Sequence, residues 1–481
     1  MQAFGQRARS GQFIMQAMPR LRKIFFTVPV ALIALATGAA WWAYGEIGKT
    51  PGELMDYAQR RLQGHNKLEW VALPVIGQLR SWVDQPSRDE LLKTPFVIPP
   101  PPALVKTPIG NIPDTAAPVT DPTQRLLRVG PFEDIRTIAQ AAKLARDGDI
   151  VEIQAGEYHG DVAVWSQKKL TIRTSGGNAR LFADGKSAEA KAIWVIRNGD
   201  FDIENIDFIG ARVPDKNGAG IRFEGGSLRL RNCLFYGNEN GLLTTGTPSS
   251  LEIVNSEFAY NGYGDGQSHN IYVGQIDSLK ITGSYFHHAN VGHLIKSRAQ
   301  NNHIYYNRIT DESGGRASYE LNLPNGGTAY VVGNILQQGS QTQNSTLIAY
   351  GEEGLVWPKN NLYLASNTMV NDQSFGGNFL RSAPGLQRLV SVNNLFVGSG
   401  RYHTTGISIE STNDTNADWA YFVQASRHDY RVNEGMLTPA KATELSAELV
   451  PKFQYAHPHD TRKLTDLTLF PGAVQPSQSA R

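Results

Sequence analysis

Short apolar runs, interrupted by polar residues, make up most of the chain after about residue 126. Three of these runs align on alternate apolar or small positions: Ile271 and Val273, Ile295 and Ser297, and Leu321 and Leu323. Side chains along a strand point to opposite faces in turn. The pattern therefore predicts three neighbouring strands, about 4.8 Å apart, that place Tyr272, Lys296 and Asn322 in one outward column.

A short motif that ends in a large apolar residue recurs along the same part of the chain. Its apolar members are Phe208, Phe235, Phe258, Phe286, Ile309, Ile335, Met369 and Phe396. Their spacing of about 23 to 34 residues is typical of a solenoid repeat, and no long helical pattern separates them. This favours a parallel β-helix over a β-sandwich with long hairpins. It also predicts a stack inside the coil of Phe208, Phe235, Phe258, Phe286, Ile309 and Ile335.

Composition agrees with a chain of turns and short strands. Of 481 residues, 47 are glycine, which suits many tight turns. Basic and acidic residues number 46 and 44, and this near balance gives no indication of a nucleic-acid partner. The single cysteine, Cys233, excludes an internal disulfide framework and is expected as a small buried strand residue.

The first 45 residues predict a membrane anchor. Residues 1–23 contain basic but no acidic side chains, and residues 24–45 contain no charge over about the length that crosses a bilayer. Aromatic residues at the far end resemble an interfacial belt, and the basic segment places the N-terminus in the cytoplasm. We expect a single-pass protein of a bacterial inner membrane, with the bulk of the chain in the periplasm. The alternative is a cleaved signal peptide, with Gly38 and Ala40 before the cut.

The remaining chain divides by composition into four parts. Residues 46–93 have a helical pattern, and residues 94–125 form a proline-rich linker that is typical of a stiff, extended segment. Residues 126–435 are expected to form the parallel β-helix domain. Residues 436–481 are expected as a C-terminal cap and tail, because a solenoid needs its open end covered.

The repeating part of the chain resembles a known group of proteins. A predicted helix at 135–146, followed by GDIVEIQAGEY, resembles the N-terminal cap and first turn of the right-handed parallel β-helix proteins of the pectate-lyase-like superfamily. The resemblance extends from Leu126 to about Tyr430. The expected fold class is therefore an all-β, right-handed parallel β-helix, or solenoid, with an N-terminal membrane helix and a short helical segment.

Within that group, the sequence IKSR at 295–298 resembles the alginate lyase and chondroitinase B type of polysaccharide lyase. The resemblance implies that Lys296 acts as a base and that an arginine one coil on, Arg316, assists. Ile295 stands where the family pattern has a first serine. The sequence ANVG at 289–292 stands where those enzymes bind calcium through acidic residues. No cofactor is therefore expected, and calcium is left open because the family's ligands are not matched.

The chemistry also follows from the residues themselves. Elimination on a uronate glycan removes a proton next to a carboxylate, whose charge must first be neutralised. Lys296 is the candidate base, since positive charge on Arg298 and Arg316 favours its neutral form. Either arginine suits paired contacts with a carboxylate, and Tyr272 or Tyr319 is a candidate acid for the leaving oxygen. The predicted partner is an acidic polysaccharide of open identity, held by His269, Asn270, His293, Tyr319, Glu320 and Asn322.

Other functions stay open on the same residues. A uronate C5-epimerase shares the proton removal, whereas a glycoside hydrolase needs two carboxylates. The candidate carboxylates are Asp311, Glu312, Glu320, Glu352 and Glu353. From a different class, the domain could be a non-catalytic glycan-binding scaffold of an exopolysaccharide system. Separately, Lys296 and Arg298 could be exposed strand charges paired to Glu320. The spacing of His287, His288 and His293 resembles a metal cluster only loosely. The oligomeric state is left open.

Overall fold

The computed structural model describes Ile76 and residues 95–103, 124–342, 344–373, 376–440, 446–465 and 469–475. The chain divides into two compact units, residues 1–91 and 92–481. The expected basic segment at 1–23, the membrane anchor at 24–45 and nearly all of the helical segment at 46–93 lie outside the described residues. Within the described ranges, no helix has the length and apolar character needed to cross a membrane.

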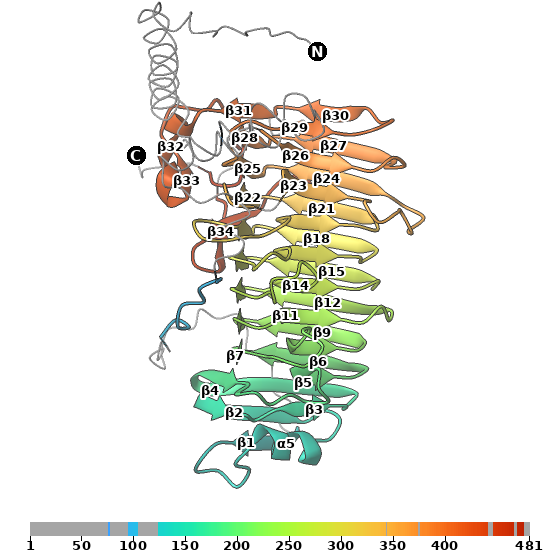
Figure 1. The fold of residues 1–481 in the computed structure, drawn as a ribbon, viewed down its shortest axis with the longest axis vertical. Coiled ribbons are helices and arrows are strands. Elements are labelled where there is room, and N and C mark those ends of the chain that lie inside the picture. The colour runs from blue at the N-terminus through green and yellow to red at the C-terminus, as the bar shows by residue number, and fades with distance from the viewer. Residues whose placement is uncertain are drawn as a thin grey trace, which may run out of the picture. The chain divides into compact units, whose positions relative to one another are not determined.

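Parallel strands stack along one coil, and each turn pairs with the turn before and after it (Figure 1). One face of the coil is a sheet of ten strands. These are β3 (Ala163–Trp165), β5 (Ala192–Ile196), β8 (Ala219–Phe223), β11 (Asn240–Thr244), β14 (Ile271–Val273), β17 (Ile295–Ser297), β20 (Leu321–Leu323), β23 (Thr346–Tyr350), β26 (Asn378–Ser382) and β29 (Arg401–His403). This pairing confirms the predicted parallel β-helix of the right-handed type.

The other sheet has 21 strands and bends into two columns. It begins with β1 (Leu126–Val129), β2 (Ile150–His159) and β4 (Lys169–Phe182). The first column continues with β6 (Gly199–Glu204), β9 (Gly226–Arg231), β12 (Ser249–Val254), β15 (Ser278–Thr282), β18 (Asn301–Tyr305), β21 (Thr328–Val332), β24 (Asn361–Ala365), β27 (Arg388–Val392) and β30 (Ile409–Thr412). The second continues with β7 (Ile206–Ile209), β10 (Leu234–Tyr236), β13 (Glu257–Ala259), β16 (Tyr285–His287), β19 (Arg308–Thr310), β22 (Ile335–Gln338), β25 (Thr368–Asn371), β28 (Leu395–Val397) and β31 (Thr415–Ala417).

The core of the coil contains the predicted stack of large apolar side chains. Phe208, Phe235, Phe258 and Phe286 are fully buried, and successive ring centroids lie 5.0, 4.4 and 4.7 Å apart. Ile309 pairs with Phe286 and continues the column. The repeat identified in the sequence is therefore the repeat that builds the core.

One member of the predicted stack is wrong by one residue. Leu336, not Ile335, pairs with Ile309. In all eight motifs the stacked residue comes three positions after a residue with positive φ, and in this motif that residue is Gly333, with φ of 68°. The turn sets the register, so Ile335 faces away from the stack and joins a separate apolar cluster.

Buried asparagines line the bends between the two columns. In one ladder each side-chain nitrogen donates to the next Oδ1, at 3.0, 3.1 and 2.9 Å, along Asn307, Asn334, Asn367 and Asn394. Their Oδ1 atoms also accept from backbone amides of the preceding turn. The asparagine side chains thus pair with buried backbone groups that the strands leave unpaired, which explains why asparagine recurs in the motifs.

A short helix precedes the first full turn. The helix α5 (Ile138–Leu144) is capped by Thr137, whose hydroxyl accepts from the Gln140 amide at 3.1 Å. The Asp161 carboxylate accepts from the first two helical amides at 2.6 and 2.9 Å. Ile138 joins the main core, so the helix that the sequence predicts at 135–146 is present and shorter than expected.

Two segments that are distant in sequence lie against the outside of the 21-stranded sheet. In the proline-rich segment, residues 95–103 contact the coil directly. The Tyr236 hydroxyl donates to the Pro99 carbonyl at 2.9 Å, and Arg180 donates to the Pro102 carbonyl at 2.8 Å. This described part of the linker thus lies on the coil rather than standing free of it.

The C-terminal part runs along the side of the coil. It contains η1 (Trp419–Tyr421), β32 (Phe422–Gln424), η2 (Ala425–Arg427), β33 (Asp429–Val432), β34 (Phe453–Ala456) and β35 (Asp460–Lys463). The Asn255 side chain donates to Asp460 at 3.1 Å, and the Ala473 amide donates to the Thr368 hydroxyl at 3.0 Å. The described residues of the expected cap and tail at 436–481 therefore bridge distant turns of the coil.

Candidate functional site

The outer face of the ten-stranded sheet carries the predicted column. Tyr272 pairs with Lys296, and Lys296 pairs with Asn322, as the sequence alignment expects. Strand pairing extends the column in both directions, to Leu243 and Arg222 on one side and to Ala349 and Arg381 on the other. Cationic side chains thus stand at the centre and near both ends of this column.

The centre of the column is an arrangement of two cations, one ring and one carboxylate. The Lys296 ammonium lies 3.0 Å from Glu353 Oε1, and the Arg298 guanidinium contacts the other oxygen of Glu353. Arg298 lies over the Tyr272 ring at 4.9 Å, and the Lys296 ammonium is 5.9 Å from that ring. The Lys296 and Arg298 side chains are only 12% and 16% exposed, so the two charges are largely shielded from water.

This shielding changes the acid–base properties of the site. Burial lowers the pKa of Lys296, and the charge on Arg298 adds to the effect, although the hydrogen bond from Lys296 to Glu353 opposes it. Burial disfavours the charged form of Glu353, yet hydrogen bonds from Lys296 and Arg298 outweigh burial and hold the Glu353 pKa below its ordinary value. A lysine with a lowered pKa beside a fixed cation suits proton abstraction.

The carboxylate comes from the loop after β23, which the sequence does not place in this column. The loop leaves the strand at Gly351 and turns again at Gly354, with φ of 80° and 95°. The Trp357 indole donates to the Arg298 carbonyl at 3.1 Å and holds the end of the loop on the sheet. The neighbouring Glu352 lies 3.7 Å from Arg381. The only signal in the sequence is a pair of acids between two glycines, directly after a strand of this sheet.

Tyr319 and the buried histidines surround the column. Burial and the nearby Glu352 carboxylate raise the pKa of Tyr319, which favours its protonated form. His269 stacks on His293 at 4.4 Å and accepts a hydrogen bond from the His293 amide at 3.0 Å. Burial lowers the pKa of His293 to about 3 and that of His269 well below its ordinary value. His269 stacks on the Tyr272 ring at 5.7 Å, and His293 lies edge-on to the Tyr319 ring at 4.9 Å, so the two buried histidines support these rings from behind.

Three predicted site residues lie away from the column. Asn270 is fully buried and accepts from Asn261 inside the coil at 2.8 Å. Glu320 is also fully buried, so it does not pair with Lys296. Arg316 lies at another corner, with its guanidinium 5.5 Å above the Phe96 ring. Residues that flank a short strand need not continue its alternation, and for this reason the expected outward directions of Asn270 and Glu320 are wrong.

A groove extends from the column along the same sheet. It has a volume of about 610 Å³ and reaches Tyr272 and Arg298. Its other walls include Arg222 on β8, Asp215 and Lys216 in the loop before β8, and Asp265 and Gln267 in the loop before β14. The charged and polar lining fits a hydrophilic ligand, and the Tyr272 ring at its edge lies 5.9 Å from the Lys296 ammonium.

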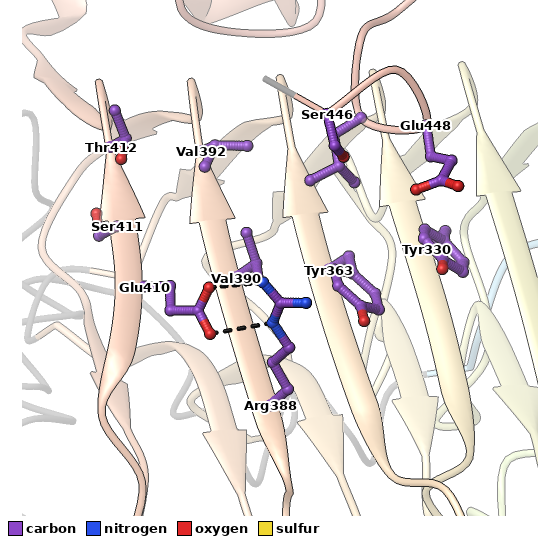
Figure 2. A pocket seen from close by; sticks show the side chains of 11 residues that line it. Tyr330, Tyr363, Arg388, Val390, Val392, Glu410, Ser411, Thr412, Ser446 and Glu448 are labelled. Atoms are coloured by element: carbon purple, nitrogen blue, oxygen red, sulfur yellow. Dashed lines mark hydrogen bonds and ion pairs between the residues drawn. The ribbon is translucent and has the colours of Figure 1, made fainter. Parts of the chain in front are cut away.

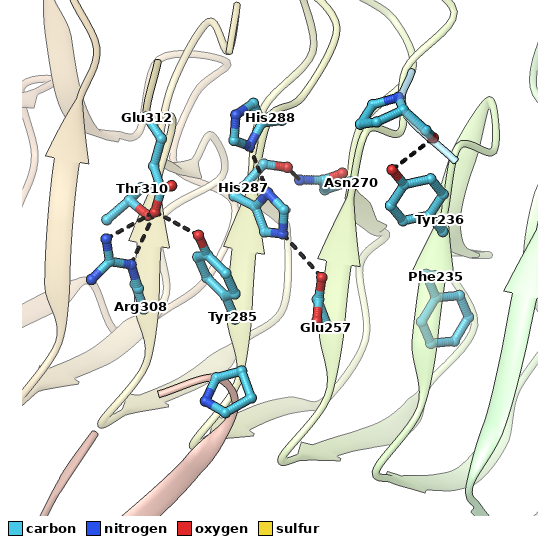
Figure 3. Close-up of polar contacts among 12 residues, drawn as sticks. Phe235, Tyr236, Glu257, Asn270, Tyr285, His287, His288, Arg308, Thr310 and Glu312 are labelled. Atoms are coloured by element: carbon cyan, nitrogen blue, oxygen red, sulfur yellow. Dashed lines mark hydrogen bonds and ion pairs between the residues drawn. The ribbon is translucent and has the colours of Figure 1, made fainter. Parts of the chain in front are cut away.

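Figure 3 shows a second polar cluster, on the 21-stranded sheet. His287 Nε2 lies 3.1 Å from Glu257 Oε1, and the Tyr285 hydroxyl donates to Glu312 at 2.5 Å. His457 of the C-terminal segment packs on Tyr285 at 5.5 Å and covers the cluster. No group of three or more His, Cys, Asp or Glu side chains within the described ranges is arranged to hold a metal. We assign this cluster to the docking of the C-terminal segment.

Figure 2 shows a second groove, of about 410 Å³, between the 21-stranded sheet and residues 446–449. The rings of Tyr330 and Tyr363 stack at 4.6 Å, and Arg388 lies 5.7 Å from the Tyr363 ring. Arg388 donates to both oxygens of Glu410 at 3.0 and 2.8 Å. Because the rings cover one another, this groove offers ring edges rather than open faces. The column on the ten-stranded sheet is therefore the stronger candidate.

Comparison with known proteins yields only distant structural likeness. No protein-family model matches the sequence, and no curated protein matches it. The chain is similar to pectate lyase Pel9A, with a TM-score of 0.35 and 13% identity, over 74% of this chain and 97% of that one. It is also similar to ORF18 of Geobacillus virus E2, with a TM-score of 0.33 and 15% identity. That match covers 56% of this chain and 53% of the viral protein, so the chain spans about half the length of the latter. The fold assignment accordingly rests on the strand pairing within this chain.

Proposed function

We propose that this chain binds an acidic, uronate-containing glycan across the outer face of the ten-stranded sheet and cleaves it by β-elimination. The observation that carries the proposal is the shielded Lys296, whose pKa is lowered by burial and by Arg298. The two cations already hold a carboxylate, that of Glu353. The same pair of cations is suited to the carboxylate of a uronate unit.

The reaction begins when the substrate carboxylate replaces Glu353 on Arg298. The positive charge of Arg298 neutralises that carboxylate and makes the proton on the neighbouring carbon more acidic. Neutral Lys296 removes this proton, and the electron pair forms a carbon–carbon double bond as the bond to the glycosidic oxygen breaks. Tyr319, kept protonated by burial and Glu352, donates a proton to the leaving oxygen, with Tyr272 as the alternative donor. The products are a new chain end and an unsaturated uronate.

The test is an incubation of the full chain with a panel of uronate glycans while ultraviolet absorbance reports the new double bond. We expect one glycan to give an absorbing product and Lys296→Ala to abolish its formation. Lys280→Ala is the matched control, because Lys280 is an exposed lysine on the other sheet that pairs with Glu252 at 2.8 Å. Full activity of Lys296→Ala on a confirmed substrate would place the chemistry elsewhere.

Two other reactions give different outcomes in the same assay. A C5-epimerase would exchange the proton next to the carboxylate with deuterated solvent and leave the chain uncut. A hydrolase would cut the chain without forming a double bond, and Glu352→Gln or Glu353→Gln would then be fatal.

A non-catalytic glycan-binding function is the second candidate. The ion pair with Glu353 favours it, because that pair stabilises the charged form of Lys296, which cannot accept a proton. In this case a uronate glycan binds without being cut, and Tyr272→Ala weakens the binding by removing the ring beneath Arg298. We further propose that residues 24–45 anchor the chain in a bacterial inner membrane, with the coil in the periplasm.

A further inference from the structure

The groove beside the candidate site runs along the axis of the coil. Its lining includes Arg222 on β8, Leu243 on β11, Tyr272 on β14 and Arg298 directly after β17. These four strands are consecutive neighbours in the ten-stranded sheet, so the groove crosses four turns of the coil. An extended polymer can therefore lie in the groove across the strands.

Arg222 brings a weakly compensated positive charge to this groove. The nearby Glu224 carboxylate accepts from Lys191 at 2.7 Å and from Arg197 at 3.2 Å. Glu189 forms ion pairs with the same two cations. The Arg222 Nε lies 4.0 Å from Glu224 Oε1, which is too far for a hydrogen bond. Two carboxylates thus face three cations, and Arg222 has the weakest share of their negative charge.

The guanidinium group of Arg222 also has unused hydrogen-bond donors. None of its N–H groups donates to a residue that the structure describes, and its Nε is buried. The side chain is only 26% exposed. An arginine carries five N–H donors in a planar fork that matches the two oxygens of a carboxylate. Because Arg222 lines the groove, its donors are available to an anionic group of a ligand bound there.

Strand pairing sets the distance between Arg222 and the candidate site. The Arg298 guanidinium lies over the Tyr272 ring at 4.9 Å. Tyr272 pairs with Leu243, and Leu243 pairs with Arg222, so two strand spacings, or about 10 Å, separate the two cationic groups. A pyranose unit lengthens an extended glycan by about one strand spacing. Arg222 therefore lies two units away from a unit held on Arg298, and the intervening position is the uncharged Leu243.

We propose that Arg222 binds a second carboxylate of the glycan, two units from the uronate whose carboxylate lies on Arg298. Arg222 is then a specificity-determining residue that selects acidic chains of at least three units. The bound chain lies along the coil axis, over β14, β11 and β8. This inference rests on the glycan binding proposed above and does not depend on the cleavage step.

The rest of the lining favours a glycan over other polyanions. Asp215, Asn217, Asp265 and Gln275 line the same groove. Their carboxylate and amide oxygens can accept hydrogen bonds from sugar hydroxyl groups. The two carboxylates also repel a polymer that presents a negative charge on every unit, such as a polyphosphate. The groove thus fits a chain whose acidic groups are separated by hydroxyl groups.

The test is calorimetric titration with monomers, dimers and trimers of galacturonate, glucuronate and mannuronate, using the full chain with Lys296→Ala to prevent cleavage. We expect the trimer of at least one uronate to bind at least tenfold more tightly than its dimer. Adding Arg222→Gln should remove this gain and leave the affinity for the dimer unchanged. Arg222→Lys should keep part of the gain, because it retains the charge but not the planar fork. Arg229→Gln is the matched control, since Arg229 is an exposed arginine on the other sheet that pairs with Glu252 at 2.7 Å, and it should keep the full gain.

Two results would overturn the inference and leave the proposed function in place. One is a trimer that binds no more tightly than its dimer, a comparison that needs no Arg222 variant to fold. The other is an undiminished gain in Arg222→Gln. Reducing either end carboxyl group of the trimer to an alcohol should likewise return its affinity to that of the dimer. If none of these oligomers binds, the proposed function itself is wrong, and the inference is wrong with it.

Discussion

Replacing Phe258 tests the register of the whole coil. Its ring is fully buried between those of Phe235 and Phe286, at centroid distances of 4.4 and 4.7 Å and nearly parallel to both. Truncation to alanine removes a core aromatic group that the neighbouring turns cannot replace, so we expect a loss of about 3–5 kcal/mol in the free energy of unfolding. Phe258→Leu keeps most of the volume and loses mainly two ring contacts of about 0.5–1.5 kcal/mol each. That variant should therefore lose about 1–3 kcal/mol.

The assay is equilibrium unfolding in urea, with the slope of the transition compared between variants. An unchanged slope indicates that the same surface is exposed on unfolding and that the midpoints compare free energies. A lower slope for Phe258→Ala would show that turns on either side of the substitution unfold separately, as expected for a linear array of repeats. A loss below about 1 kcal/mol for Phe258→Ala would contradict the closed stack.

Four further predictions address the site, the acid stability and the anchor. Lys296→Arg should be as inactive as Lys296→Ala in a turnover assay, because a guanidinium stays charged and cannot accept a proton. Arg298→Ala should lower kcat/KM more than tenfold, since the carboxylate that Arg298 neutralises gains charge as the proton leaves. Arg308 and Tyr285 lower the Glu312 pKa from 4.5 to about 2 despite burial. The ionised Glu312 should therefore contribute roughly 3 kcal/mol to the free energy of unfolding. This contribution should be fully present above pH 4.5 and should be lost as pH falls toward 2. Glu312→Gln should flatten that part of an acid-unfolding curve. The full chain should remain with membranes in high salt, because an apolar span is not held by charge, and a mature N-terminus near Trp41 would instead indicate a cleaved signal.

The alternation of apolar and polar residues was sufficient to predict the column of Tyr272, Lys296 and Asn322. Each of these strands has three residues and one outward position, so aligning the buried neighbours identifies the outward residue. The error at Ile335 arose because GNIL offers two adjacent apolar residues, and only the position of the left-handed residue decides between them. The backbone conformation of the turn thus determines which of the two apolar residues enters the core stack.

Such patterns do not predict the ion-pair partner of Lys296. Glu353 is 57 residues away in sequence, and its position depends on the path of a loop over the sheet. Asn270 and Glu320 show the related difficulty at strand ends. The same position contributes Leu294 or Leu347 to the core on other turns, so a polar residue there is buried although nothing in its immediate sequence indicates it.

The C-terminal segment has a consequence for synthesis of the protein. Each turn of the coil pairs with the turn next to it, so turns can form as the nascent chain leaves the ribosome. Asn255, however, meets Asp460 only after 205 more residues, which takes on the order of 10 to 40 s at about 5–20 residues per second. Once Ile335 and Val370 have been made, their outward apolar cluster stays uncovered until Tyr455 and Ala473 of the C-terminal segment arrive. Loss of the C-terminal segment should leave a folded coil whose uncovered apolar side promotes aggregation.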